Sequence, residues 1–447
     1  MDSADSYPPR RAAWYALLVL TLCYTFSFID RQILAFLVGP LKQELAISDT
    51  QIGLLQGLAF AVFYTFFGLP IGRLADRLSR RNIIIAGLLL WSTMTALSGA
   101  ARSYLALAAA RMGVGVGEAT INPCAFSMIA DYFPKERLSS AMSVYMMGIQ
   151  LGSGLALVIG GIVVQAITQM PPIHLGNLGP VAPWRLTFFA VGLPGILFAV
   201  LLLSVKEPPR RTPPGARALV SGGPASVVPI SETLAFVASR WQSVIGIGLM
   251  IGCQAMSNYA LLGWGPTFFE RVHSWPKSQS GLVLGLITLG SGCTALYAGG
   301  RLADRWQRNG TTDGTLRVNL IGLIGVGITM PLALLLPSAG ATVAVLVVTV
   351  FFVGLPIGCS YAALQLIFPS QMRGLASSIV LFLVNLVGLG LGSLLPGLFN
   401  DYLFRDGLKV GDSIALTAAL AGFTGSVIVA LTLKPYRRHY ALLHAAA

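Results

Sequence analysis

The chain has 447 residues, of which 55% are hydrophobic and only 11% are charged. A soluble domain carries roughly 25% charged residues, so this composition excludes a soluble globular protein, and the high apolar content excludes a disordered one. It predicts an integral membrane protein. The formal net charge is +13, but the basic residues occur in short runs between apolar segments. That pattern is typical of membrane topology rather than of a nucleic-acid-binding surface.

Stretches of about 20 mostly apolar residues predict twelve membrane-spanning helices in an all-α protein. An even number of helices places both termini on one side of the membrane. Of the 30 Lys and Arg residues, 21 fall on that side and 7 on the other, which predicts cytoplasmic termini. Short loops and no large soluble domain favour a bacterial inner (plasma) membrane. The predicted helices cover residues 13–38, 51–72, 82–101, 104–130, 139–166, 185–205, 241–268, 279–301, 317–337, 341–366, 374–399 and 412–433.

The longest loop follows the sixth predicted helix and is rich in Pro, Gly, Ser and Arg. Such a composition is typical of a linker. We therefore expect an N-terminal six-helix bundle at 1–205, a cytoplasmic linker at 206–240, and a C-terminal six-helix bundle with a short cytoplasmic tail at 241–447.

The two expected bundles share sequence motifs at a nearly constant offset. The hexapeptide GRLADR at Gly72–Arg77 recurs 228 residues later at Gly300–Arg305. Gly39-Pro40 reappears as Gly265-Pro266, at an offset of 226. Because the copies of GRLADR lie between corresponding helices of the two halves, the halves have the same orientation, which predicts a parallel pseudo-repeat.

Four charged residues lie inside predicted membrane helices. Arg111 and Glu118 are two turns apart on one face of the fourth helix, and the glycines of Gly113–Gly117 between them allow a neighbouring helix to approach closely. Asp30 and Arg31 lie near mid-membrane depth in the first helix and point about 100° apart. We expect Asp30 to face Arg111 and Arg31 to face Glu118. Ionisable groups at this depth mark transport pathways; the alternative is a static ion pair that only fixes helix packing.

These charges suggest a coupling chemistry. A buried carboxylate is costly when it is ionised and unpaired, so movement of its arginine partner favours proton uptake. Asp30 and Glu118 are therefore the predicted proton-coupling residues. The planar guanidinium of Arg31 or Arg111 suits an anionic headgroup such as phosphate. A phosphate that competes with the carboxylate for the guanidinium would couple substrate binding to protonation.

The second half has no corresponding mid-span acid, since Asn258 stands 228 residues after Asp30. Its polar side chains are expected to supply hydrogen bonds to the substrate, although each could also be a helix-packing residue. The candidate substrate-binding residues there are Asn258, Tyr361, Gln365 and Asn385, with Gln254 and Tyr259 beside them. Most of the phenylalanines at 60, 63, 66 and 67 are expected to face lipid. The stretches Gly354–Gly358 and Gly388–Gly392 are expected to act in gating.

The repeated loop motif resembles that of the major facilitator superfamily, whose members have twelve helices in two six-helix halves. This resemblance implies a cytoplasmic gate. In that gate Asp76 accepts bonds from a helix start near Gln371–Gly374, while arginines tie the halves together. The alternative is that the arginines only retain the loop in the cytoplasm. The first copy is matched by Gly72, Leu74, Asp76, Arg77, Arg80 and Arg81, and the second by Gly300, Asp304, Arg305 and Arg308.

Three further stretches are similar to the Spinster family of lipid transporters: YTFSFIDRQIL at Tyr24–Leu34, RMGVGVGEATINP at Arg111–Pro123 and MIADYFPKERLSSAMSVY at Met128–Tyr145. That family is associated with export of sphingosine 1-phosphate or lysophospholipids. The resemblance implies a secondary active transporter that moves an amphipathic, anionic lipid by alternating access, coupled to protons. We expect a monomer without cofactor or metal.

Other functions remain open at this point. The same motifs permit a carrier of small organic anions or drugs, and the fold could serve a non-transporting sensor or scaffold. An enzyme acting on lipids is disfavoured because no nucleophile stands beside a histidine base. A nucleotide-driven pump is disfavoured because GVGVGE lacks the Lys-Ser/Thr of a phosphate-binding loop. The five cysteines are scattered singly and are interpreted as packing residues.

Overall fold

The computed structural model describes residues 7–75, 77–171, 173–174, 180–210, 230–368 and 373–444. These residues are almost entirely helical, and they include eleven helical segments that are long and apolar enough to cross a membrane. The chain is therefore a multi-pass integral membrane protein, as its composition predicted. It divides into two compact units, of which the first comprises Met1–Arg211 and Gly265–Leu286 and the second comprises Thr212–Trp264 and Ile287–Ala447.

This division differs from the sequence-based boundaries in one segment. The end of one long helix and the beginning of the next, Gly265–Leu286, belong to unit 1, whereas the sequence assigned the whole of 241–447 to the second bundle. The expected linker at 206–240 also contains a helix, α12 (Ile230–Ser239). Residues 211–229 of that linker lie outside the described part of the chain.

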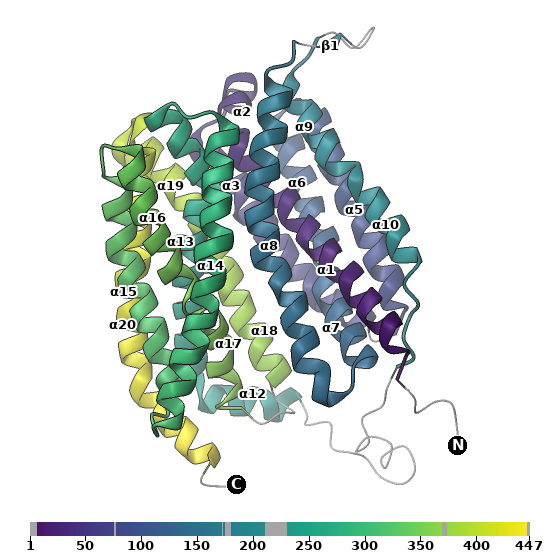
Figure 1. Cartoon of the computed structure of the whole chain (residues 1–447), viewed down its shortest axis with the longest axis vertical. Coiled ribbons are helices and arrows are strands. Elements are labelled where there is room, and N and C mark those ends of the chain that lie inside the picture. The colour runs from purple at the N-terminus through teal and green to yellow at the C-terminus, as the bar shows by residue number, and fades with distance from the viewer. Residues whose placement is uncertain are drawn as a thin grey trace. The chain divides into compact units, whose positions relative to one another are not determined.

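Unit 1 is a bundle of antiparallel helices joined by short turns (Figure 1). We call the end where α1 begins its near end and the opposite end its far end. A two-stranded antiparallel ladder pairs Ile173 with Val181 at the far end. The elements are α1 (Arg10–Gln32), η1 (Ile33–Phe36), α2 (Val38–Leu45), α3 (Asp49–Gln56), α4 (Leu58–Ala75), α5 (Arg80–Ala100), α6 (Tyr104–Glu118), α7 (Ile121–Tyr132), α8 (Lys135–Thr168), β1 (Ile173–His174), β2 (Pro180–Val181), α9 (Pro183–Gly192) and α10 (Pro194–Leu203).

Serine caps set the starts of several of these helices. Ser79 begins α5 and Ser103 begins α6, each accepting a hydrogen bond from a backbone N–H of the first turn. Ser48 begins α3 in a complete capping box with Gln51. Such side chains satisfy N–H groups that have no partner within the helix. The polar residues between the apolar runs thus fix where each helix enters the bundle.

The fourth expected span, 104–130, is two helices rather than one. It divides into α6 and α7 at Ala119–Thr120. Pro123 has no N–H to donate to the carbonyl of Ala119, so a continuous helix would lose a hydrogen bond at this point. The hydroxyl of Thr120 instead donates to the carbonyl of Gly117, at 2.8 Å. The segment 104–130 is the one expected span that is not among the eleven long apolar segments of the described residues.

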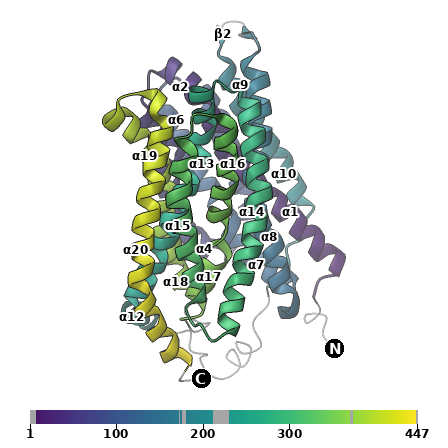
Figure 2. The same ribbon diagram turned by 60° about the vertical axis from the view of Figure 1, so that its left-hand side comes forward.

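Unit 2 is helical throughout the part of it that the structure describes. In it α15 and α20 pack along their length (Figure 2), and their backbones meet where a Cβ on Gly422 would lie 2.5 Å from the Cα of Gly327. Its elements are α12, the first part of α13 (Trp241–His273), most of α14 (Lys277–Arg308), α15 (Gly314–Leu334), α16 (Ala339–Gly354), α17 (Ile357–Gln365), α18 (Arg373–Leu383), the π-helical η4 (Val384–Leu391), α19 (Gly392–Leu398), the π-helical η5 (Phe399–Phe404), η6 (Gly407–Lys409) and α20 (Val410–His444).

Both glycine-rich stretches expected to act in gating coincide with irregular backbone. Gly354–Gly358 spans the change from α16 to α17 at Leu355–Pro356. Gly388–Gly392 covers the end of the π-helical η4. Proline and π-helical turns are places where a helix lacks its regular hydrogen bonds and bends. The gating role itself stays a prediction.

Candidate functional site

Two ion pairs join α1 to α6 in the middle of unit 1. Arg31 donates to Glu118 Oε2 through Nε at 2.6 Å and through its terminal nitrogen at 2.5 Å. Arg111 approaches Asp30 Oδ1 at 3.4 Å. The two pairings expected from the sequence are therefore confirmed as geometry. Arg111 and Glu118, which lie on one helix, each reach across to α1 instead of pairing with each other.

These four groups are withdrawn from solvent. The side chains of Asp30, Arg111 and Glu118 are at most 2% exposed and that of Arg31 is 14% exposed. Glu118 Oε1 and Arg111 Nε have no hydrogen-bond partner among the described residues. A buried polar atom without a partner is unfavourable, and charged groups inside a membrane helix mark transport pathways. The cluster therefore has unused hydrogen-bonding capacity on both a carboxylate and a guanidinium.

A third group holds Asp30. The hydroxyl of Thr95, on α5, donates to Asp30 Oδ2, and Thr95 is fully buried. Sequence reasoning missed this residue because a single threonine in an apolar helix carries no signal of its own. The one indirect indication is the buried acid Asp30 on a neighbouring helix, because a buried carboxylate needs hydrogen-bond donors.

Aromatic rings surround the guanidinium of Arg31. Its central carbon lies 4.5 Å from the ring centre of Phe60, 5.1 Å from that of Phe28 and 5.2 Å from that of Tyr64. Ring faces attract cations at these distances. Phe60 is only 1% exposed and is an exception to the expectation that most of these phenylalanines face lipid, whereas Phe66 is 70% exposed, in line with it.

A polar chain continues from this aromatic group. The Asn122 amide nitrogen donates to the Tyr64 hydroxyl at 3.0 Å, and the Tyr145 hydroxyl donates to the Asn122 oxygen at 2.9 Å. Tyr145 stacks on Tyr24 with ring centres 4.8 Å apart. Asn122 lies in the first turn of α7, so these hydrogen bonds link α7 to α4 and to α8. Sequence reasoning did not single out this group.

The glycines of α6 permit the close packing that brings the charges together. A Cβ at Gly115 would lie 2.8 Å from the carbonyl oxygen of Phe60 on α4. A Cβ at Gly117 would lie 2.8 Å from backbone and side-chain atoms of Trp91 on α5. Both distances are too short for a side chain, so the expected close approach of neighbouring helices is confirmed.

The substrate-binding candidates of the second half all lie in unit 2. Asn258 is on α13, Tyr361 and Gln365 are on α17, and Asn385 is in η4. Asn385 Nδ2 is buried and has no partner among the described residues. Gln254 donates to the carbonyls of Phe352 and Val353 at 3.1 and 3.0 Å, which makes it a helix anchor at the end of α16.

The first copy of the repeated motif forms a polar cluster at the near end of unit 1. Arg80 is 1% exposed and donates through Nε to Glu207 at 2.8 Å and through a terminal nitrogen to Asp131. Glu207 also accepts from Ser79 and from the backbone N–H of Arg81. Burial raises the pKa of Glu207, but these donors outweigh it and hold the pKa below its ordinary value.

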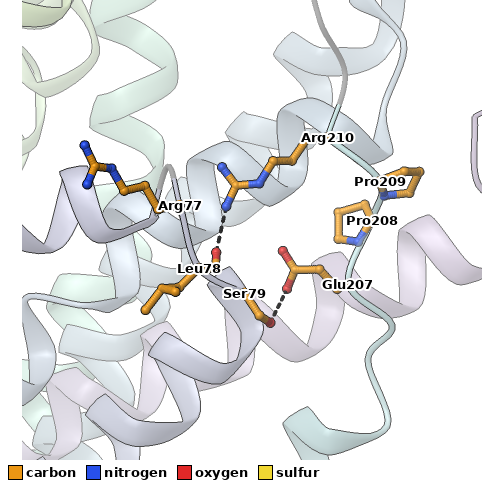
Figure 3. A pocket seen from close by; sticks show the side chains of 7 residues that line it. All are labelled: Arg77, Leu78, Ser79, Glu207, Pro208, Pro209 and Arg210. Atoms are coloured by element: carbon orange, nitrogen blue, oxygen red, sulfur yellow. Dashed lines mark hydrogen bonds between the residues drawn. The ribbon is translucent and has the colours of Figure 1, made fainter.

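Arg80 and Arg81 make hydrogen bonds within unit 1, and the expectation that the arginines tie two halves together stays a prediction. Both guanidiniums donate to the segment that follows α10: Arg80 to Glu207 and the carbonyl of Pro208, and Arg81 to the carbonyl of Val205. Residues of this segment line a pocket of about 390 Å³ with Arg77 (Figure 3). Gly72 lies in α4, while Asp76 and the expected partner Gln371 lie outside the described residues.

The second copy of the motif is not a loop. Gly300, Asp304 and Arg305 lie within α14, which continues to Arg308, whereas the sequence ended this span at 301. Arg308 donates back to the carbonyl of Asp304. The turn follows at Gly310, whose φ of +79° favours glycine.

The sequence profile of the Major Facilitator Superfamily matches residues 20–393, and the chain belongs to this family of membrane transporters. It is 30% identical to an MFS-type efflux pump of Mycolicibacterium smegmatis, over 98% of this chain and 96% of that one. It is 25% identical to a probable L-galactonate transporter of Escherichia coli, over 79% and 74% of the two chains.

The fold is also similar to a solved structure of a bacterial homologue of the human lysosomal transporter Spinster, in an inward-facing and unoccupied conformation. The TM-score is 0.76 at 25% identity, and the match covers 97% of both chains. The resemblance to the superfamily and to Spinster, stated from sequence motifs, is thereby confirmed.

Proposed function

We propose that this transporter moves an amphipathic, anionic lipid of the lysophospholipid or sphingosine 1-phosphate type across the membrane, coupled to protons. The observation that carries the proposal is the pair of buried ion bridges between α1 and α6, with Glu118 Oε1 lacking a partner among the described residues. The fold similarity to a bacterial Spinster homologue supports the resemblance to that family, and the lipid class is what that resemblance implies. The transporter works as a monomer by alternating access.

The ion pairs supply a coupling step. A phosphate oxygen that binds the guanidinium of Arg31 competes with Glu118 Oε2, because both acceptors need the same two nitrogens. Glu118, buried and deprived of its cation, then gains a proton, since an unpaired charge in a low-dielectric site is costly. Asp30 responds in the same way when Arg111 leaves it. Asp30 and Glu118 thus carry the proton, and Arg31 and Arg111 bind the anion.

The environment of Arg31 suits an amphipathic ligand. The rings of Phe28, Phe60 and Tyr64 lie against the same guanidinium that binds the headgroup. In unit 2, Asn385 Nδ2 has no partner among the described residues, and Asn258, Tyr361, Gln365 and Asn385 stay the proposed substrate-binding residues of that unit. The arginines of the repeated motif and Asp304 lie on the cytoplasmic side of the membrane in this proposal. Both termini lie in the cytoplasm of a bacterial cell.

A carrier of small organic anions or drugs is the second candidate. The relatives that favour it are the mycobacterial efflux pump and the probable L-galactonate transporter. The same guanidinium fork binds a carboxylate as readily as a phosphate. The two candidate functions differ in their substrate: a lipid carrier needs an acyl chain attached to the anionic group, and a carrier of small organic anions does not.

The test is flux in proteoliposomes. We expect labelled lysophospholipid or sphingosine 1-phosphate to move faster under a pH gradient than without one, and Glu118→Gln and Asp30→Asn each to reduce the gradient-driven component at least tenfold. Matched controls are Glu232→Gln on the exposed face of α12 and Asp412→Asn, which loses only a surface pair with Lys409 at 3.2 Å. Both controls should transport like the parent.

Two results would decide against parts of this proposal. Flux of galactonate or a comparable small anion, with no lipid flux by the same folded protein, would favour the second candidate. Lipid flux that Glu118→Gln and Asp30→Asn leave unchanged would remove the carboxylates from the coupling step.

A further inference from the structure

The short helix α12 lies crosswise to the long helices of unit 2 (Figure 1). It ends at Ser239, and α13 begins two residues later at Trp241. Val237 belongs to a buried hydrophobic cluster of unit 2, and Phe236 packs against that cluster. The rings of Phe236 and Phe368 meet edge-on with their centres 5.4 Å apart. These contacts dock α12 on the end of unit 2 at which α13 begins.

The exposed side chains of α12 form an apolar strip and a polar strip. Leu234, which is 47% exposed, and Ala238 are four residues apart and therefore lie on one face of the helix. Glu232 and Ser239 are also exposed and lie seven residues apart on another face, roughly 130° around the helix from the first. Together with the side that packs on unit 2, α12 thus has a protein-facing, an apolar and a polar side. Such a helix suits the boundary between lipid and water.

The first residue of α13 carries a further exposed apolar side chain. Trp241 is 59% exposed, and it begins one of the long apolar segments of the chain. Tryptophan is enriched where a membrane helix passes from the hydrocarbon into the headgroup layer. We therefore expect the junction of α12 and α13 to lie at the depth of the lipid headgroups.

Arg240 lies at this junction, and its guanidinium forms no ion pair with a described residue. Its central carbon lies 3.6 Å from the ring centre of Phe236, and a terminal nitrogen donates to Ser239 Oγ at 3.1 Å. Its Nε is buried and has no hydrogen-bond partner among the described residues. Burial lowers the pKa of Arg240, and no described carboxylate offsets this effect. A partly buried cation with an unused donor is unfavourable unless an anion reaches it from outside the chain.

A second arginine raises the positive potential at the same place. Ser243, in the first turn of α13, hydrogen bonds to Nδ1 of His439 on α20 at 2.8 Å. Arg438 directly precedes His439 and is exposed. Arg240 and Arg438 both lie within electrostatic range of His439. The junction therefore carries an excess of positive charge next to exposed apolar side chains.

We propose that Arg240 binds the phosphate of an anionic phospholipid of the surrounding bilayer, while α12 lies in the headgroup layer with Leu234 and Trp241 against the acyl chains. A rotation that turns the guanidinium edge outward lets Nε and a terminal nitrogen bind two phosphate oxygens, in the bidentate geometry that guanidinium and phosphate favour. Basic groups beside a membrane helix attract anionic headgroups. The apolar strip beside Arg240 selects a lipid over a free phosphate. This inference goes beyond the proposed transport function, whose substrate site is centred on Arg31 in unit 1.

Thermal unfolding in detergent measures this binding. Phosphatidylglycerol should raise the unfolding temperature of the parent protein in a saturable way, because a ligand of the folded state stabilises it. Phosphatidylcholine, which has no net charge, and inorganic phosphate should raise it much less at the same concentration. Arg240→Gln should raise the apparent dissociation constant of phosphatidylglycerol about tenfold. Arg240→Lys keeps the charge but loses the planar fork, and its dissociation constant should lie between the two.

The matched control is Arg317→Gln in the same unit. The Arg317 side chain is 46% exposed, but it is already paired with Asp313 at 3.1 Å, so its removal should leave phosphatidylglycerol binding unchanged. Equal binding by the parent and folded Arg240→Gln would overturn the site. An equal response of the parent to inorganic phosphate or to phosphatidylcholine would overturn the assignment to an anionic phospholipid.

Spin labels test the placement of α12 by a separate measurement. In a chain whose five native cysteines are replaced, we would label Leu234→Cys and Glu232→Cys and reconstitute each protein in liposomes. The label at position 234 should be the more accessible to oxygen, which concentrates in hydrocarbon. The label at position 232 should be the more accessible to a water-soluble nickel complex. Equal accessibility of the two labels, or the reverse pattern, would overturn the interfacial placement.

The two proposals for this protein fail independently. Neither the unfolding titration nor the spin-label measurement requires transport. Absence of lipid flux in proteoliposomes, with both of these results as expected, would reject the proposed substrate and leave the phospholipid site at Arg240 standing.

Discussion

A single hydroxyl group completes the surroundings of Asp30. Its carboxylate contacts Arg111 at 3.4 Å through one oxygen and accepts from Thr95 through the other. The longer contact to Arg111 is the looser of the two, so Thr95 holds the Asp30 side chain in place while Arg111 is available to another anion. At the residue scale, the site depends as much on this neutral donor as on the charges.

Replacement of Thr95 should therefore weaken the folded state. Thr95→Val removes a hydrogen bond to a charged group, worth about 1.5–3 kcal/mol, while it keeps the shape of the side chain. We expect a lower free energy of unfolding by that amount, measured by thermal unfolding in detergent. Thr95→Ser retains the hydroxyl and serves as the control. Equal stability of the two variants would show that the hydroxyl contributes nothing to the fold.

At the scale of elements, the near end of unit 1 is organised by the segment after α10. Glu207 accepts from the side chain and backbone of Arg80, and the Tyr132 hydroxyl at the end of α7 donates to the carbonyl of Lys206. One short segment thus binds the start of α5 and the end of α7. Because Arg80 is buried, its guanidinium needs partners for its charge and its N–H donors, and Glu207 and Asp131 supply them.

The stability of this junction should depend on pH. The folded-state pKa of Glu207 lies below its ordinary value of 4.5, so ionised Glu207 stabilises the fold above the unfolded-state pKa, and that contribution is lost as pH falls through the folded-state pKa. We expect a constant difference in unfolding temperature between the parent and Glu207→Gln above about pH 5. The difference should shrink at lower pH. A pH-independent difference would contradict the assignment to this carboxylate.

At the scale of the whole molecule, the distribution of basic residues sets the expected orientation. The cluster of Arg77, Arg80 and Arg81 in unit 1 is assigned to the side that carries most Lys and Arg residues, and the turn at Arg405–Lys409 in unit 2 is assigned to the other. The positive-inside rule then predicts that both termini are cytoplasmic.

Reporter fusions test that orientation. We expect alkaline phosphatase fused after residue 406 to be active in the periplasm, and the same enzyme fused after residue 309 or at the C-terminus to be inactive. A green fluorescent protein at the C-terminus should be fluorescent. Active phosphatase at the C-terminus would reverse the proposed topology.

The sequence alone determined the membrane class, the positions of nearly all spans, the repeat and the pairing of Asp30 with Arg111 and Arg31 with Glu118. Each of these features follows from a rule that a short stretch of sequence obeys by itself. The length of an apolar stretch sets a membrane span, and a charge buried in a membrane needs a partner of opposite sign. With two acids and two arginines on two helices, helix geometry left few pairings.

Only the tertiary structure decided what depends on contacts between segments far apart in the chain. Thr95 beside Asp30, Phe60 beneath Arg31, and Arg80 bound to Glu207 and Asp131 involve residues whose own sequence neighbours carry no sign of the contact. The same holds for Asp49 and Arg271, which are 222 residues apart and each look like ordinary helix-end charges. Side-chain packing between helices selects such partners, and a one-dimensional pattern of hydrophobicity and charge does not contain that packing.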